Sequence, residues 1–206
     1  MNNPIIGIVI PIIQKKYIFN LIKEIKSSTN MNNYIICVVN DGNNQINTLL
    51  KNKLPNDIEL LNLENNLCFA GANNAGWKYL IQKYPSIQYL CTINDDTIPK
   101  MKWLEYLFAT LTSNSNFGAC NPIMLYYSGI LIKKTNHIST WRLGTGNPPM
   151  ILDKKKINCD NIVPVIGGFC LLAKLKALLE INFFDSKYKN SCEDIDLSLK
   201  LREKNW

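Results

Sequence analysis

Two apolar runs constrain the fold of this chain more than any other feature. Residues 5–10 and 34–39 are rich in Ile and Val, and neither run alternates with polar residues. A strand of this kind is buried on both faces, as in a parallel sheet that has helices on both sides. Pro11 directly follows the first run and predicts that the first strand ends there.

Amphipathic segments alternate with the apolar runs. Ile18, Leu21, Ile22 and Ile25 recur at helical spacing among lysines, which predicts a helix with one apolar stripe. The pattern then predicts a strand at 58–63, a helix from about 71 to 83, a strand at 89–93, a helix near 103–111 and a strand around 119–125. This order is typical of an α/β fold with a mostly parallel central sheet flanked by helices.

Length and composition predict a single domain. The chain has 206 residues and is 47% hydrophobic, enough to bury one substantial core but short for two. We therefore expect one domain that spans residues 1–206, either complete in itself or the N-terminal part of a longer protein.

Two later segments have no clear period. Residues 128–164 combine glycines, prolines and two lysine clusters, and a loop of this length predicts a functional wall or lid. Residues 194–202 alternate strictly between polar and apolar, which is a strand period. Their acids nevertheless come first and their bases last, as the helix dipole favours, so we predict a helix.

The cysteines and the net charge indicate the cellular compartment and the kind of partner. The seven cysteines are odd in number, form no Cys-x-x-Cys pair and mostly sit in apolar runs, which predicts reduced thiols in a cytoplasmic protein. No segment resembles a signal peptide or membrane helix. The net charge of +7 suits an anionic partner and leaves peripheral membrane contact open. Lysine clusters without interleaved aromatic residues argue against nucleic acid.

Acidic and amide side chains follow two of the predicted strands. Asn94, Asp95 and Asp96 come after the strand at 89–93, and Asp41 comes after the run at 34–39. Ligands of open α/β sheets bind beyond the carboxyl ends of the strands. Adjacent carboxylates there suit Mg²⁺ or Mn²⁺ bridging a diphosphate. For an isolated Asp pair, a solvated turn or a helix cap is the better explanation.

Three further positions are candidates for chemistry. Residues 65–76 gather small residues and amides around a helix start, where backbone N–H groups can face a ligand. Glu193 and Asp194 open the predicted last helix, where an acid serves as a cap or as a general base. His137, the one histidine, is either an ordinary surface residue or a third metal ligand.

Taken in order, these segments resemble family 2 glycosyltransferases of the GT-A fold, especially their rhamnosyltransferase-like branch. Asn94-Asp95-Asp96 is similar to the branch's variant of the Asp-x-Asp metal motif, in which Asn replaces the first Asp. The other matching segments are the opening strand at 8–11, the nucleotide-contacting turn at 38–42, the Asn-rich segment at 66–76, the acceptor-side strand at 165–170 and the Phe-Asp to Glu-Asp-x-Asp-Leu signature at 183–197.

The resemblance implies an inverting hexosyltransferase that moves a sugar from a UDP-hexose or dTDP-rhamnose donor to a hydroxyl of a glycan or other acceptor. Asp194 would be the general base, Glu193 would orient the site, and Asp96 would bind Mn²⁺ or Mg²⁺. The implied donor contacts are Pro11, Asp41, Asn66, Asn74, Asn94 and Asp95, and Gly167 and Gly168 would line the acceptor side.

The sequence departs from the family pattern at Cys68 and Asn205, and two other functions remain as alternatives. Cys68 and Asn205 each stand where the family usually has Gly, and Asn can adopt the left-handed conformation that Gly provides at a helix end. A sugar-phosphate nucleotidyltransferase would need a glycine-rich loop after the first strand, and residues 12–16 lack glycine. A catalytically silent module that binds glycans or nucleotides is the other alternative.

Overall fold

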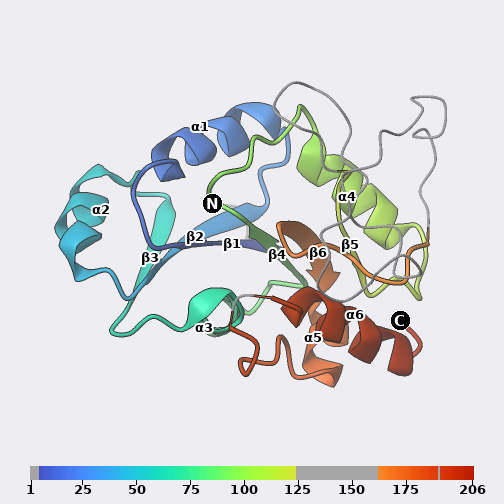
Figure 1. The fold of residues 1–206 in the computed structure, drawn as a ribbon. Coiled ribbons are helices and arrows are strands. Elements are labelled where there is room, and N and C mark those ends of the chain that lie inside the picture. Colours follow the sequence, from blue (N-terminus) through green and yellow to red (C-terminus); the bar gives the residue numbers. More distant parts are fainter. Residues whose placement is uncertain (1–4, 124–161, 190) are drawn as a thin grey trace, which may run out of the picture.

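A computed structural model describes residues 5–123, 162–189 and 191–206. His137 and most of the segment 128–164 lie outside these residues. The described part contains a six-stranded sheet in the order β3-β2-β1-β4-β6-β5 (Figure 1). The strands are β1 Ile6–Ile12, β2 Tyr34–Asp41, β3 Ile58–Leu63, β4 Tyr89–Ile93, β5 Ala119–Cys120 and β6 Cys170–Lys174.

The first four strands are parallel, and the two that follow complete the sheet on one side. β1 pairs with β2 and β4 in parallel, and β2 pairs with β3 in the same way. β6 runs antiparallel to β4 and to β5. The predicted fold class, a single α/β domain with a mostly parallel central sheet, is confirmed.

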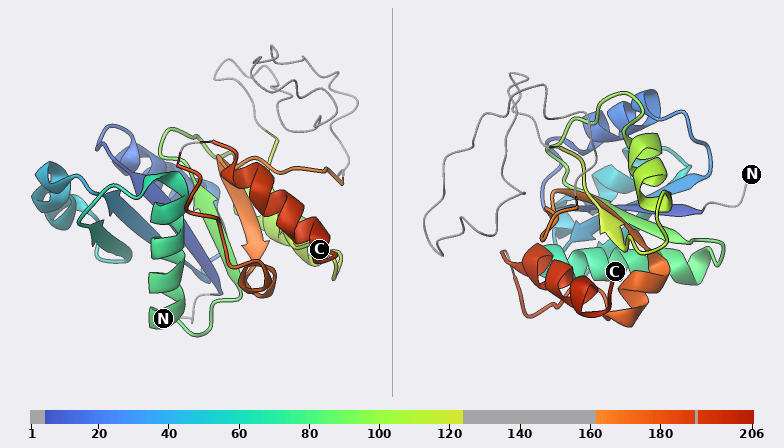
Figure 2. Two further views of the ribbon diagram at one scale, coloured as in Figure 1. Left: turned by 60° about the horizontal axis from the view of Figure 1, so that its bottom comes forward. Right: turned by 90° about the vertical axis from the view of Figure 1, so that its right-hand side faces the viewer.

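Helices cover both faces of the sheet. α1 (Ile18–Ser28), α2 (Asn47–Lys53) and α4 (Trp103–Thr112) lie on one face, and a short 3₁₀ turn at Asn44–Ile46 precedes α2. α3 (Cys68–Lys83), α5 (Leu175–Glu180) and α6 (Glu193–Glu203) lie on the other, as both views in Figure 2 show. Each face has its own cluster of buried apolar side chains, so burial on both sides explains why the strands read as unbroken apolar runs.

The prediction that Pro11 ends the first strand is wrong. β1 continues to Ile12, and Pro11 is in register with Val39 of β2. β4 pairs with β1 only as far as Val9. Pro11 therefore lies beyond the part of β1 that has partners on both sides, where the missing N–H costs no bond to β4.

Other boundaries also differ from the predictions. α3 begins at Cys68 instead of about residue 71, and the strand expected at 165–170 begins only at Cys170. β5 is limited to two residues of the predicted 119–125, whose last two positions lie outside the described residues. The sequence patterns did not reveal α2 and α5, which are only seven and six residues long.

The last segment is a helix, as its charge distribution predicted. Leu197 and Leu201, one turn apart, are buried, whereas Leu199 is 45% exposed. The first turn carries Glu193, Asp194 and Asp196, and the last turn carries Lys200 and Arg202. The strict alternation of residues 194–202 thus has no counterpart in burial, because only one stripe of the helix faces the core.

The cysteines and the helix lengths relate to the predictions of reduced thiols and of no membrane helix. The cysteines of the described residues form no disulfide with one another: Cys37, Cys91 and Cys170 are buried, and Cys68, Cys120 and Cys192 are half-buried. Within the described ranges, no helix has the length and apolar character needed to span a bilayer.

The close approach of α3 to the sheet depends on Gly76. A Cβ atom at this position would lie 2.7 Å from Cγ2 of Val39 and 2.8–2.9 Å from the two methyl carbons of Val9. We expect Gly76→Ala to lower the free energy of unfolding by about 1–3 kcal/mol, because α3 must shift away from a rigid β-branched surface. Urea unfolding measures this loss. Gln82→Ala, on an exposed position of the same helix, should change stability by less than about 0.5 kcal/mol. Equal stabilities of the two variants would show that α3 tolerates the shift.

Candidate active site

A pocket of about 340 Å³ opens at the carboxyl ends of β1, β2 and β4. Five of the residues singled out in the sequence line it: Pro11, Asp41, Asn94, Asp95 and Asp96. The remaining lining residues come from the end of β1, from the loop after it and from the start of α3: Ile12, Ile13, Gln14, Tyr17, Cys68 and Phe69. Three strand ends that are far apart in sequence thus form one site, as the strand-end rule for open α/β sheets predicts.

Asp41 is fixed at the floor of this pocket. Its side chain is buried, and Oδ1 accepts a hydrogen bond of 2.6 Å from the backbone N–H of Leu67. Burial raises the pKa of this carboxyl, and the N–H groups of Leu67 and Cys68 oppose the rise. Gly42 follows with a φ of +80°, and the backbone of Asn66 occupies the place that a Cβ would need. The turn therefore packs directly on the segment before α3.

The start of α3 explains one departure from the family pattern. Cys68 has a φ of +59°, in the left-handed region that favours glycine, and its side chain lines the pocket. Asn66 accepts a hydrogen bond of 2.8 Å from the N–H of Cys68, so its side chain holds this turn and is not among the lining residues. Asn205 has a φ of +62°, which confirms the left-handed conformation expected of it.

Asp95 and Asp96 form a carboxylate pair at the rim. Asp95 is half-buried and Asp96 is exposed. Burial, and then the neighbouring charge of Asp96, raise the pKa of Asp95. Asn94 anchors the turn to the residue that precedes β6, because its N–H donates a bond of 2.8 Å to the carbonyl oxygen of Phe169. A divalent cation fits this pair, since it would offset the repulsion between the carboxylates.

The pair alone does not complete a coordination shell. Among residues 5–123, 162–189 and 191–206, no group of three His, Cys, Asp or Glu side chains could hold a metal ion. Mg²⁺ and Mn²⁺ sites that use one or two carboxylates take phosphate and water oxygens as their other ligands. A cation at this pair would therefore need further oxygen ligands from phosphate or water.

Asp194, the predicted base, is held by backbone groups on both of its carboxylate oxygens. Oδ2 accepts a bond of 3.0 Å from the N–H of Gly168, and Oδ1 accepts one of 2.9 Å from the N–H of Ile195. Ser198 donates to the carbonyl oxygen of Asp194 at 2.6 Å and accepts from the N–H of Ile166 at 3.1 Å. The segment before β6 is thereby tied to the first turn of α6.

Gly168 lies between the predicted base and the pocket wall. A Cβ atom on Gly168 would lie 3.4 Å from Cβ of Asp194 and 3.4 Å from Cε1 of Phe69. Phe69 in turn lines the pocket. Gly168 therefore lies beside both Asp194 and Phe69, and Phe69 is a lining residue of the pocket.

Glu193 is 9% exposed, and within the described residues its Oε2 atom has no hydrogen-bond partner. Burial raises the pKa of this carboxyl, and the charge of Asp194 adds to the rise. The fold therefore disfavours the charged form of this buried carboxyl next to the predicted base.

Replacing Glu193 with Gln is expected to stabilise the protein above about pH 5. A raised pKa in the folded state means that the folded protein holds this proton more tightly than the unfolded chain does, so stability falls as pH rises from the ordinary value of 4.5 through the raised one. Unfolding midpoints in urea should favour the Gln variant at about pH 8, and the difference should vanish towards about pH 4. Glu203→Gln, exposed on the same helix, should show no such trend. A pH-independent difference would mean that Glu193 is not charged in the fold.

Asn74 is not brought into the pocket. Its Nδ2 donates to the carbonyl oxygen of Phe184 at 2.8 Å, and its Oδ1 accepts from the N–H of Phe184 at 3.2 Å. The sequence interpretation also missed Tyr17 and Phe69 as lining residues. Tyr17 lies in the loop directly after the first strand, so the strand-end rule could have indicated it.

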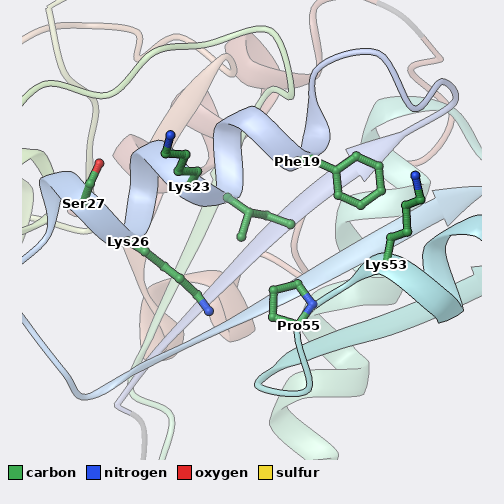
Figure 3. Close-up of a pocket in the computed structure, with 7 residues that line it drawn as sticks. Phe19, Lys23, Lys26, Ser27, Lys53 and Pro55 are labelled. Carbon is green, nitrogen blue, oxygen red and sulfur yellow. The ribbon is translucent and has the colours of Figure 1, made fainter.

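A larger hollow, of about 580 Å³, lies between α1 and the α2–β3 connection (Figure 3). Its lining consists of Phe19, Ile22, Lys23, Lys26, Ser27, Lys53 and Pro55. It contains no acidic side chain and none of the residues predicted for chemistry, and Lys26 is paired with Asp57 at 2.6 Å. The smaller pocket at the strand ends is therefore the candidate active site.

Two solved structures are similar to this chain over 98% of its length. TarS of S. aureus, residues 1–349, has a TM-score of 0.59 at 16% identity, and 55% of that chain is covered. The mannosyltransferase PcManGT from Pyrobaculum calidifontis, solved in complex with GDP-Man and Mn²⁺, has a TM-score of 0.66 at 11% identity, with 53% covered. At these identities the likeness shows the fold alone, and this chain spans little more than half the length of either structure.

Sequence comparison shows the family. No curated protein sequence matches the chain significantly. The sequence model described as glycosyl transferase family 2 matches residues 7–181, which is most of the chain and includes every element from β1 to α5. This match leads to one conclusion: the chain belongs to glycosyl transferase family 2.

Proposed function

We propose that this protein is an inverting glycosyltransferase that uses a nucleotide-diphosphate sugar, a divalent cation and Asp194 as general base. The single observation that carries the proposal is the junction of the strand-end pocket with Asp194 across Phe69 and Gly168. A donor in the pocket would lie beside the base, as a direct displacement requires.

The donor would be held by groups from three strand ends. Pro11 and Asp41 line the inner part of the pocket with Asn94, and the Asp41 carboxylate suits a hydrogen-bond donor of the nucleoside. Asp96, with Asp95 beside it, would hold Mn²⁺ or Mg²⁺. When bound there, the cation would supply positive charge to offset the negative charge that develops on the departing nucleoside diphosphate.

Asp194 would act on the acceptor. Its carboxylate takes the proton of an acceptor hydroxyl while the hydroxyl oxygen forms a bond to the anomeric carbon. The bond from that carbon to the phosphate oxygen breaks on the opposite side, so the configuration inverts and the nucleoside diphosphate leaves. Gly167 and Gly168 leave room for the acceptor beside the base, and the backbone bonds to Asp194 fix the orientation of its oxygens.

The proposal also includes the branch of the family and the donor that the enzyme uses. The Asn94-Asp95-Asp96 motif supports the rhamnosyltransferase-like branch and hence dTDP-rhamnose, and UDP-hexoses are the alternative donors. GDP-mannose joins the set because the similar mannosyltransferase binds it. A cytoplasmic location and peripheral contact with an anionic membrane are consistent with the free thiols and the net charge of +7.

The experiment is a transfer assay with UDP-hexoses, dTDP-rhamnose and GDP-mannose, with and without Mn²⁺, followed by NMR of the anomeric centre of the product. We expect metal-dependent release of a nucleoside diphosphate and a product of inverted configuration. Retention of configuration would exclude Asp194 as a base in a single displacement. Release of pyrophosphate from a nucleoside triphosphate and a sugar phosphate would instead indicate a nucleotidyltransferase, and donor binding without turnover would indicate a silent module.

A further inference from the structure

The side-chain amide of Asn74 holds one peptide unit of a segment 110 residues away. Nδ2 donates to the carbonyl oxygen of Phe184 at 2.8 Å, and Oδ1 accepts from the N–H of the same residue at 3.2 Å. Both bonds therefore end on Phe184, which fixes the position and the orientation of its backbone relative to α3. We call this pair of bonds the Asn74 clamp.

The ring of Phe184 is held by the same helix. It is 98% buried and stacks on Trp77 with a centroid distance of 5.2 Å and an interplanar angle of 14°. It also meets Phe69 edge-on at 5.7 Å. Asn74, Trp77 and Phe69 all belong to α3, so backbone and side chain of Phe184 are both positioned by one element.

The clamped segment is under backbone strain. Asn182 and Phe183 have φ values of +60° and +63°, so two successive residues with a Cβ adopt the left-handed conformation. That conformation is unfavourable for such residues, and most of all for a bulky one. It persists where the surroundings hold it, and the contacts of Phe184 with α3 immediately follow it in the chain. Loss of the clamp should let this turn relax.

The position of the clamp matters because α3 also forms a wall of the donor pocket. Phe69 lines the pocket and lies against Gly168, whose N–H binds the carboxylate of Asp194. The segment that the clamp holds leads from Phe184 into α6, whose first turn carries Asp194. α3 therefore positions both sides of the site. It forms part of the pocket wall itself, and it holds, through the Asn74 clamp, the segment that leads into α6.

We propose that Asn74 is a positioning residue for glycosyl transfer, which sets the separation of Asp194 from the donor without touching the donor. The inference rests on the proposed function. It differs from the donor contact that the sequence resemblance implies for Asn74, and the two roles have different kinetic signatures. A donor contact acts on donor affinity, whereas a positioning residue acts on the rate of the bound complex.

The test compares Asn74→Ala and Asn74→Asp with wild type. Asp keeps the shape and the acceptor for the N–H of Phe184 but cannot donate to its carbonyl oxygen when ionised. We expect kcat to fall by about 100-fold in Asn74→Ala, as misplacement by about 1 Å can cause, while the donor Kd stays within about twofold. Asn74→Asp should also lose kcat with an unchanged donor Kd, and it serves where Asn74→Ala fails to fold. Gln82→Ala, exposed on α3, is the matched control and should keep both values.

Hydrogen exchange gives a readout that does not depend on turnover. Faster exchange of the amides in residues 183–189 and 191–198 of the variants, with α1 unchanged, is the expected result. A donor Kd that rises in step with the loss of kcat would overturn the proposal in favour of a donor contact. If the folded fraction of the Asn74 variants keeps the wild-type kcat, Asn74 contributes to stability alone and does not position Asp194. If wild type turns over no donor, the proposed function fails, and unchanged exchange would separately reject the clamp.

Discussion

Asp194→Asn is expected to bind the donor as wild type does and to turn it over about 10²–10⁴ times more slowly, the usual contribution of a general base. Asn has the shape of Asp, and its Oδ1 can still accept a bond from the N–H of Gly168 or Ile195. It cannot take a proton from an acceptor hydroxyl, so the loss should fall on kcat and not on donor affinity. Steady-state rates and an equilibrium donor titration on the same preparation measure both quantities.

Asp57→Asn is the matched control for this substitution. Asp57 is 67% exposed in its side chain and pairs with Lys26 of α1. The same change of charge there should leave kcat unaltered. If Asp194→Asn keeps the full wild-type rate, the base has been assigned to the wrong residue, whatever the other substitutions do.

Asp96→Ala is expected to remove the response to Mn²⁺ and to lower kcat/KM by about 10²–10³, comparable with the loss of one preorganised group that stabilises developing charge. Wild type should lose activity when the metal is chelated and recover it when Mn²⁺ is restored. Asp96→Ala should be nearly as slow with Mn²⁺ as without it. A Mn²⁺ titration of initial rates checks both statements.

Asp95→Asn separates the roles of the two neighbouring carboxylates. Asp95 is half-buried towards the pocket, so its loss should raise the donor KM while some Mn²⁺ stimulation remains. The raised pKa of Asp95 adds a pH dependence, because protons compete with the donor-bound cation at a higher pH than for an ordinary Asp. An Asp96→Ala protein that still responds to Mn²⁺ as wild type does would rule out Asp96 as the metal ligand.

The centre of the sheet could be predicted because β1, β2 and β4 are mostly buried. The strand at 58–63 and the strand at 89–93 have the predicted bounds, since turn residues follow each of them. Pro11 misled the prediction because local chemistry does not show how far a neighbouring strand extends. α3 begins three residues early because Asn66 stabilises its start and Cys68 adopts a conformation that its residue type rarely takes.

The sequence predicted only part of the site, because local patterns do not show contacts between distant segments. Asp41 is the last residue of β2, and Asp95 and Asp96 follow β4 closely. The carboxyl ends of parallel strands meet at one edge of the sheet, where these residues line one pocket. The partner of Asn74 is 110 residues away, so no local pattern could show that Phe184 uses its amide. Asp194 depended on the choice between strand and helix, which burial of Leu197 and Leu201 decides only once the fold is known.

The most direct test of the central claim is thermal unfolding of the protein with a panel of nucleotide sugars, each with and without Mn²⁺. A ligand that binds only the folded state at 100 times its Kd adds about 2.7 kcal/mol to the free energy of unfolding. We predict that at least one nucleotide sugar raises the melting temperature, more so with Mn²⁺, and that Asp96→Ala abolishes the metal-dependent part. No shift with any donor in the presence of Mn²⁺, or a shift that Asp96→Ala leaves intact, would contradict a metal-assisted donor site at the ends of β1, β2 and β4.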